Sequence, residues 1–215
     1  MSNSGNARTT PDVSFLAGAP TPVTHDSVVY TGPGHDTILD YGSGNDRLYG
    51  GGLYNVIRAG SGNDIVYGGY GTNQLYAGTG NDVLVGGGLL SFLYGGLGRD
   101  VLIGGPGQSF LYGGAGDDLM IAGTTGYDSN DAALTAILNE WTSGNSFAIR
   151  IGHLQGTLAG GANGAFLLSA ATVHANGMRN YLYGGLKQNW FFANPGPGLP
   201  SDIVVKKPTD MVTTI

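Results

Sequence analysis

The stretch GSGNDIVYGGYGTNQLYAGTGND, residues 60–82, contains the pattern that decides the fold of this chain. It begins and ends with the pentad Gly-x-Gly-x-Asp, closed by Asp64 and by Asp82, so an aspartate returns after 18 residues. Halfway between them lies a similar pentad in which Asn73 replaces the aspartate. This part of the chain therefore consists of nine-residue units that are alternately acidic and neutral.

The same alternation extends in both directions from this stretch. The acidic pentads end at Asp46, Asp64, Asp82, Asp100 and Asp118, and the neutral pentads end at Asn55, Asn73, Ser91 and Ser109. Two residues after every pentad comes an aliphatic side chain: Leu48, Ile57, Val66, Leu75, Leu84, Leu93, Leu102, Leu111 and Met120. A fixed period with one apolar residue per unit is typical of a solenoid, whose repeats stack to bury a common core.

Residues 32–123 resemble the nonapeptide repeats of RTX (hemolysin-type) calcium-binding proteins, because the pentad recurs nine times in register. The resemblance implies an all-β fold: a parallel β-roll, or right-handed β-solenoid, with 18 residues per coil and a small helix-containing C-terminal capping module. Glycines suit its turns, because they permit positive backbone angles and leave carbonyls free to face an ion. The short segment around each aliphatic is long enough for one strand, so two strands and two turns make one coil.

The five acidic pentads would place their aspartates in one column along an edge of the roll. Stacked coils lie about 4.8 Å apart, where two carboxylates repel by about 1 kcal/mol in water and about 3.5 kcal/mol at a near-surface dielectric. Calcium is the natural counter-ion, since it binds carboxylate and carbonyl oxygens. We therefore predict about four Ca²⁺ ions on this edge, between successive aspartates. The predicted metal ligands are Asp46, Asp64, Asp82, Asp100 and Asp118, with the pentad glycines Gly42, Gly44, Gly60, Gly62, Gly78, Gly80, Gly96, Gly98, Gly114 and Gly116.

The opposite edge departs from the family pattern, because its pentads end in asparagine or serine. A neutral column does not repel itself, and stacked amides and hydroxyls can hydrogen-bond from coil to coil. We therefore expect this edge to be free of ions. A first, imperfect coil precedes the array, and counting in half-coils places its Asp36 above Asn55 on this neutral edge.

The regularity divides the chain into four segments. We expect an extended N-terminal arm at residues 1–26, an RTX-type β-roll at 27–123, an α+β capping module with a degenerate final coil at 124–193, and a C-terminal tail at 194–215. The capping module resembles one that follows hemolysin-type repeats in large secreted bacterial proteins, where the final coil usually carries aspartates. Here those positions are Asn180 and Asn189, so the resemblance does not extend to a calcium site in that coil.

Two helices are expected in the capping module. The first, within residues 127–141, has apolar residues along one helical face: Leu134, Ile137, Leu138 and Trp141. A shorter helix is expected at residues 146–154. The glycine-rich stretch 155–164 predicts a loop, and the apolar run 165–175 predicts strands.

The residues that flank each inward aliphatic would point outward, and many of them are apolar. On one sheet they are Ile65, Tyr67, Val83, Val85, Val101, Ile103, Leu119 and Ile121; on the other they are Val56, Arg58, Gln74, Tyr76, Phe92, Tyr94, Phe110 and Tyr112. Contiguous apolar patches of this kind mark interaction surfaces. We expect the C-terminal region to cover one face, and a second copy of the chain or another partner to cover the other.

Composition and motifs argue against several functions. The net charge of −6 and the pI near 4.8 argue against nucleic acid as a partner. No apolar stretch is long enough to span a bilayer, and neither HExxH nor GxSxG occurs. The histidines, His25, His35, His153 and His174, have no metal-ligand spacing, and Glu140 is expected to be solvated on its helix. We interpret the chain as non-enzymatic.

The sequence therefore favours an extracellular, calcium-binding structural protein that folds on calcium and assembles with itself into a filament, sheet or surface layer. RTX proteins typically leave the cell through a type I system that reads an uncleaved C-terminal segment, so the resemblance implies export by that route.

Two alternatives stay open. One is a binding module that resembles ice-binding adhesin domains, with a flat array formed by Ser43, Asn45, Ser61, Asn63, Thr79 and Asn81. The next two ranks of that array are interrupted by Leu97 and Ala115. The other alternative is the calcium-triggered secretion module of a larger enzyme or adhesin.

Overall fold

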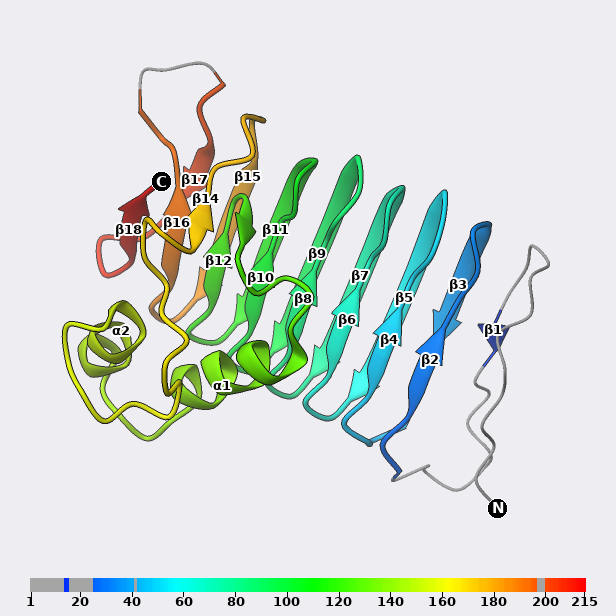
Figure 1. Cartoon of the computed structure of the whole chain (residues 1–215), viewed down its shortest axis with the longest axis horizontal. Helices are drawn as coiled ribbons and strands as arrows, with labels where there is room; N and C mark the ends of the chain where they lie inside the picture. The colour runs from blue at the N-terminus through cyan, green and yellow to red at the C-terminus, as the bar shows by residue number, and fades with distance from the viewer. Residues whose placement is uncertain (1–13, 16–24, 41, 197–199) are drawn as a thin grey trace.

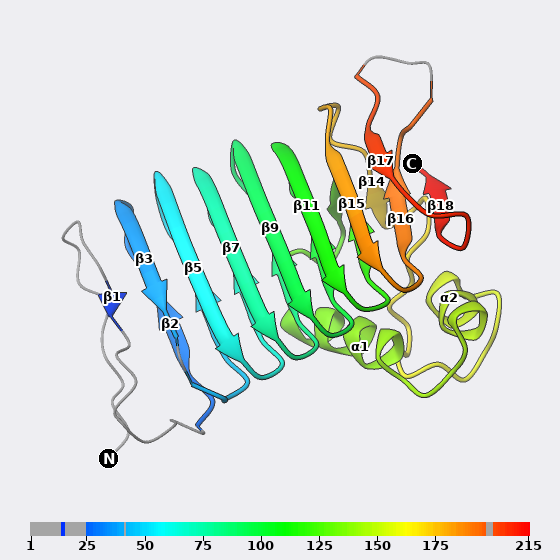
Figure 2. The ribbon, with the colours of Figure 1, turned by 180° about the vertical axis from the view of Figure 1, so that it is seen from behind.

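Two parallel sheets of eight strands each form the body of the molecule (Figures 1 and 2). The structure is a computed structural model that describes residues 14–15, 25–40, 42–196 and 200–215. Strands that follow one another along the roll alternate between the two sheets, as a coil with two strands requires. The predicted all-β, parallel solenoid is confirmed.

The two sheets differ in the length of their strands. The first sheet contains, in spatial order, β1 (Ser14–Phe15), β3 (His35–Leu39), β5 (Tyr54–Ser61), β7 (Thr72–Thr79), β9 (Leu90–Leu97), β11 (Gln108–Ala115), β15 (Tyr181–Leu186) and β17 (Ile203–Val205). The second contains β2 (Val28–Tyr30), β4 (Arg47–Tyr49), β6 (Ile65–Tyr67), β8 (Val83–Val85), β10 (Val101–Ile103), β12 (Leu119–Ile121), β16 (Trp190–Ala193) and β18 (Met211–Thr214). The central strands of the first sheet have 8 residues because they continue into the acidic turns.

Neighbouring coils are aligned at an offset of 18 residues, so that Phe92 pairs with Phe110 and Leu84 with Leu102. At this offset the aliphatic that follows each pentad lies on its equivalent in the next coil. All nine of these side chains are 0% exposed. The sequence therefore predicts the core between the sheets correctly, and Leu182 and Phe191 of the later coil extend it.

Helix α1 (Asp131–Trp141) lies across the outer face of the second sheet (Figure 1). It begins where the side chain of Asn130 accepts a hydrogen bond from the Ala133 N–H, and its apolar face packs on β6, β8, β10 and β12. The outward residues of that sheet are consequently buried, with Val83 and Ile103 both 0% exposed. The expectation that the C-terminal region covers one face is confirmed.

The N-terminus of α1 is fixed to the coils by one carboxylate. Asp131 accepts hydrogen bonds from Arg47 Nε at 3.0 Å and from the hydroxyls of Tyr49 and Tyr67 at 3.0 and 2.5 Å. The two tyrosine rings stack at 4.8 Å between centroids. Burial and the Asp131 carboxylate raise the pKa of both phenols, so these tyrosines are neutral hydrogen-bond donors.

Helix α2 (Phe147–Gln155) follows, with Ser146 as its N-cap and Gly156 in the left-handed conformation at its end. The prediction of strands over residues 165–175 was wrong except for β14 (Val173–His174), which pairs with β13 (Thr124–Thr125). Most of the run forms turns, because Leu168 packs into the cluster around α1 while Phe166 and Asn163 close a local turn. Apolar content alone did not distinguish a packed turn from a strand.

Beyond the capping helices the chain returns to the roll. Strands β15 and β16 form a coil on β11 and β12, as the spacing of Asn180 and Asn189 predicts. Strands β17 and β18 then add a further coil on β15 and β16. The segment expected to be a tail thus contributes two strands to the sheets.

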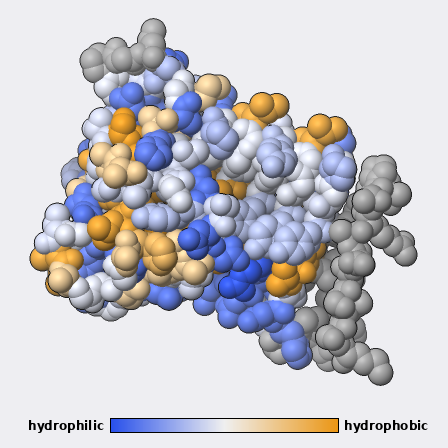
Figure 3. All heavy atoms as spheres, in the orientation of Figure 1, coloured by the Kyte–Doolittle hydropathy of each residue, from blue (hydrophilic) through white to orange (hydrophobic). Residues whose placement is uncertain are grey.

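Within the described residues no helix lies over the outer face of the first sheet, which is seen from behind in Figure 2. Aromatic rings are stacked along it in two rows: Tyr76, Tyr94, Tyr112 and Tyr183, and Phe92, Phe110 and Tyr181. Successive ring centroids are 4.6–4.9 Å apart. By contrast, the side that carries α1 shows hydrophobic residues in patches among polar ones (Figure 3). We call the seven stacked rings the aromatic face.

Candidate metal site along the aspartate edge

The five predicted aspartates lie in a single column, at the turns that lead from the first sheet to the second. They are 0–1% exposed. One oxygen of each, Oδ1, accepts a hydrogen bond from a backbone N–H of the preceding coil: Asp46 donates to Asp64 at 2.7 Å, Asp64 to Asp82 at 2.7 Å, and Asp82 to Asp100 at 2.9 Å. The ladder continues from Asp100 to Asp118 at 3.1 Å. The carboxylates are therefore held inside the edge rather than in solvent.

The other carboxylate oxygen, Oδ2, has no hydrogen-bond partner in Asp64, Asp82, Asp100 and Asp118 within the described chain. Burial raises the pKa of Asp64, Asp82 and Asp100 to about 8 in the absence of a metal ion. The pKa of Asp118 is raised to about 7 for the same main reason. A buried, unpartnered carboxylate oxygen requires a proton or a cation.

The pentad glycines bring backbone carbonyls close to the next coil. A Cβ atom built on Gly80 would lie 1.5 Å from the carbonyl oxygen of Gly62, and one on Gly98 would lie 1.5 Å from that of Gly80. These glycines also have φ near +136°, which side-chain-bearing residues rarely adopt. The third pentad position can therefore hold only glycine without displacing the turn, and its carbonyl oxygen stays directed along the column.

This donor set suits calcium. It consists of carboxylate and carbonyl oxygens, the hard ligands that Ca²⁺ prefers. Among the described residues, no three Asp, Glu, His or Cys side chains converge on one point. A cation on this edge would thus rely on carboxylates from two neighbouring coils and on turn carbonyls, as the sequence predicts for the sites between Asp46 and Asp118.

The neutral edge provides hydrogen-bond donors at the equivalent positions. The side-chain amide of Asn55 donates to the carbonyl of Gly68 at 2.8 Å, and that of Asn73 to the carbonyl of Gly86 at 3.0 Å. The hydroxyl of Ser109 likewise donates to Gly104. Aspartate in these places could not donate, so the two edges satisfy the same kind of carbonyl by different means.

Asp36 lies on the neutral edge, where β3 pairs it with Asn55 as the half-coil count predicts. Its Oδ2 is buried and has no partner in the part of the chain that the structure describes. It lies within the first of the described coils and faces an amide rather than a second carboxylate. The aspartate column proper is on the other edge.

Sequence reasoning missed two members of the side-chain ladders. The N–H of Asp118 donates to Asn189 Oδ1, and the N–H of Asn189 donates to Asp210 Oδ1, both at 2.9 Å. On the neutral edge Asn180 donates in the same way to Asp202. No period revealed Asp202 and Asp210, because they follow their partners by 22 and 21 residues instead of 18.

The prediction that Glu140 is solvated was wrong. Glu140 is 1% exposed, and it accepts hydrogen bonds from the Ala162 N–H at 2.7 Å and from Asn145. The imidazole Nδ1 of His153 lies 2.7 Å from its Oε1. These contacts join α1 to α2 and to the following loop, and the hydrogen bonds hold the pKa of Glu140 below its usual value despite burial.

A second buried ion pair joins the column to the capping helices. Arg150 of α2 is 2% exposed, and its Nη2 lies 2.6 Å from Oδ2 of Asp117, the neighbour of Asp118. The guanidinium also stacks on Trp141 at 4.6 Å. Asp117 therefore serves to fix α2 to the last acidic turn, and its pKa is lowered by these partners even though burial opposes the shift.

Two stacked sheets and a buried column of carboxylates define a calcium-binding β-roll. The family model of the RTX calcium-binding nonapeptide repeat matches the chain in four copies, over residues 40–75, 67–88 and 94–124. The chain is therefore a nonapeptide-repeat protein of the RTX type, and its cofactor is Ca²⁺. The four copies agree with about four ions, and the matched residues include all five aspartates of the column. No curated protein and no solved structure was found to match the chain.

Proposed function

We propose that the chain is an extracellular structural protein whose roll folds when calcium fills the aspartate column. The observation that carries this proposal is the row of buried Oδ2 atoms without partners. We assign the ions to the spaces between successive aspartates, with carboxylates from two coils and carbonyls of the pentad glycines as ligands. Calcium supplies the positive charge that lets these carboxylates stay ionised, and the residues themselves orient their oxygens through the backbone ladder.

Self-assembly is the second part of the proposal, and the aromatic face supports it. A large set of aromatic side chains on an open sheet is energetically costly to leave in water. Stacked, flat rings on a regular lattice of about 4.8 Å suit a second copy of the same surface. A role that rests on assembly needs no catalytic group, so we propose that the chain is not an enzyme.

RTX repeats occur in proteins exported by type I systems, which supports an extracellular location. Millimolar extracellular calcium is sufficient to fill sites of moderate affinity. Among the described residues, no helix is long and apolar enough to cross a membrane.

Sedimentation velocity and negative-stain imaging would test both parts. With about 5–10 mM calcium, well above the range of a weak extracellular site, we expect ordered polymers that dissolve in chelator. A compact monomer at all protein concentrations would refute assembly and retain the calcium-dependent roll. A fold that is unchanged in chelator would refute the calcium-dependent folding itself.

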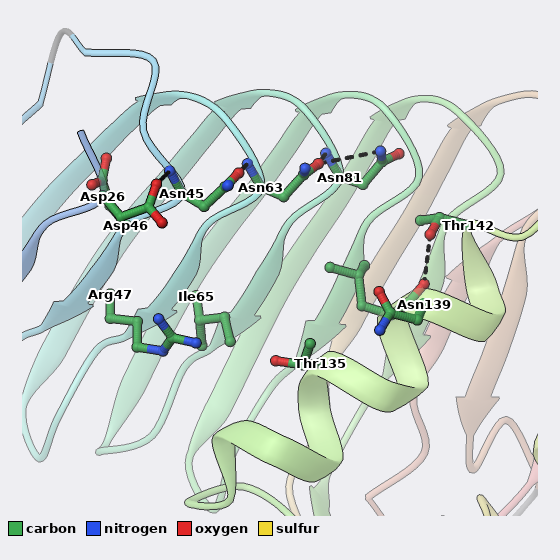
Figure 4. Close-up of a pocket in the computed structure, with 11 residues that line it drawn as sticks. Asp26, Asn45, Asp46, Arg47, Asn63, Ile65, Asn81, Thr135, Asn139 and Thr142 are labelled. Atoms are coloured by element: carbon green, nitrogen blue, oxygen red, sulfur yellow. Dashed lines mark hydrogen bonds between the residues drawn. The ribbon is translucent and has the colours of Figure 1, made fainter. Parts of the chain in front are cut away.

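A binding module is the alternative, and a polar groove favours it. The groove lies between the turns of the aspartate edge and α1, and its volume is about 320 Å³. Asn45, Asn63 and Asn81 line one wall and face Thr135 and Asn139 of α1 (Figure 4). Thermal hysteresis of the calcium-loaded protein would support an ice-binding array, and its absence would remove that form of the alternative.

A further inference from the structure

A lysine side chain enters the last turn on the aspartate edge. The ammonium group of Lys207, between β17 and β18, donates a hydrogen bond to the carbonyl of Gly185 at 2.8 Å and another to the carbonyl of Lys187. Its distance to Oδ1 of Asp210 is 4.0 Å. The positive charge is thus close to two carbonyl oxygens of one coil and to a carboxylate of the next.

That turn is a degenerate copy of the acidic pentads. Gly185 pairs with Gly114, the first glycine of the last acidic pentad, and Asn189 receives the ladder hydrogen bond of Asp118. Lys187 therefore occupies the third pentad position, which is glycine in every acidic repeat. Among the described residues it is the non-glycine residue with positive φ, at 62°. The backbone has kept the shape of a calcium-type turn although the sequence has lost the aspartate.

The neutral edge shows that the first and third carbonyls of a pentad converge on a single point. There the side-chain nitrogen of Asn176 lies 2.9 Å from the carbonyl oxygen of Gly105 and 2.7 Å from that of Gly107. These are the first and third residues of the last neutral pentad, and the carbonyl of Ala122 lies at 3.1 Å. An amide nitrogen thus lies at a point surrounded by carbonyl oxygens, where a positive group is favoured.

We propose that Lys207 is a built-in cation: its ammonium takes, in the final turn of the aspartate edge, the place that calcium takes between the aspartates. The inference rests on the proposed assignment of calcium to that edge. It makes the last step of the column independent of calcium. It also predicts that removing the ammonium leaves two carbonyls and the Asp210 carboxylate available to one additional Ca²⁺ ion.

The test compares Lys207→Met with Lys206→Met, which removes the same charge from an exposed neighbouring lysine. Native mass spectrometry and calorimetric titration would count the bound ions, and thermal unfolding would be followed at several calcium concentrations. We expect Lys207→Met to bind one more Ca²⁺ ion than the wild type, to melt at a lower temperature in low calcium, and to recover in high calcium. Lys206→Met should match the wild type throughout.

Several outcomes would overturn the inference. An unchanged ion count in Lys207→Met would show that the ammonium is only a structural hydrogen-bond donor. Failure of this variant to fold at any calcium concentration would have the same meaning, because calcium should replace the ammonium. Lys207→Arg, which keeps the charge, should retain the wild-type count. If the wild type itself bound no calcium, the proposed function would fail instead, and the two failures are thereby distinguished.

Discussion

Asp82 and Asn73 occupy the same pentad position on opposite edges, and they differ in whether the side chain can donate a hydrogen bond. Replacing Asp82 by Asn removes a carboxylate that two proposed calcium sites share. We expect Asp82→Asn to bind one or two fewer ions, about the number of sites that the carboxylate serves. Because the new amide can donate as Asn73 does, the calcium-free protein should melt at a higher temperature. Native mass spectrometry and thermal unfolding measure the two effects.

The reciprocal variant, Asn73→Asp, is the matched comparison. It adds a carboxylate to the neutral edge and removes the donor to Gly86, so the calcium-free protein should melt at a lower temperature. If both variants shifted the melting temperature in the same direction, donor capacity would not be what distinguishes the edges.

Glycine at the third pentad position is a steric requirement. Gly80→Ala would place a methyl group against the Gly62 carbonyl at a backbone angle that disfavours side chains. We expect a loss of about 2–4 kcal/mol in the free energy of unfolding, from overpacking and backbone strain. Gly144→Ala, where no atom lies within 4 Å of the added Cβ, is the control in denaturant unfolding with calcium present. Equal losses in the two variants would contradict the proposed cradle.

The raised pKa values give the calcium-free protein an unusual pH dependence. Asp64, Asp82 and Asp100 titrate near 8 when folded and near 3.8 when unfolded, so the folded state binds more protons between these values. Stability is therefore fully present below pH 3.8 as far as these groups are concerned, and it is lost as the pH rises toward 8. Asp117 and Glu140 have lowered pKa values, so their contribution is lost only in stronger acid.

We expect calcium-free protein to melt at a higher temperature at pH 5 than at pH 8, and calcium to reverse this order by replacing the protons. Circular dichroism of metal-depleted samples at the two pH values provides the measurement. A calcium-free melting temperature that rises from pH 5 to pH 8 would contradict burial of the column.

At the scale of elements, α1 is what makes the second sheet stable in water. Ile137 is 1% exposed and packs in the cluster that contains the outward valines of that sheet. Ile137→Ala should cost about 2–5 kcal/mol, the usual range for large-to-small changes in a core. Asn139→Ala, at an exposed position of the same helix, should cost less than about 0.5 kcal/mol. Urea unfolding in calcium compares them, and equal costs would show that α1 is not packed as described.

Much of the fold and the column could be predicted because the determining signal is local and periodic. An aspartate at every eighteenth residue fixes its own edge, and the aliphatic two positions later fixes its own burial. The rest depends on contacts between distant segments. The burial of Glu140 requires the Ala162 N–H, and Asp210 reaches the column only through a coil whose connection is longer than the repeat. No spacing rule contains that information.

At the scale of the whole molecule, the aromatic face determines whether the roll remains alone. Replacing Tyr94 and Tyr112 by Thr keeps a β-favouring residue while removing two rings from the centre of the longer row. We expect this double variant to bind as many calcium ions as the wild type and to sediment as a monomer. Tyr70→Thr changes an 87% exposed tyrosine at a turn of the neutral edge and should assemble normally. Assembly of the double variant at wild-type concentrations would move the interface elsewhere.

The unequal chemistry of the two edges determines how the roll opens. When calcium is withdrawn, the aspartate edge loses its counter-ions, while the amide and hydroxyl bonds of the neutral edge are unaffected. The sheets should therefore separate from one side, with the neutral edge as a hinge. A chain hinged in this way keeps each strand beside its correct neighbour. Closing again on the return of calcium is then a short conformational search rather than a complete refolding.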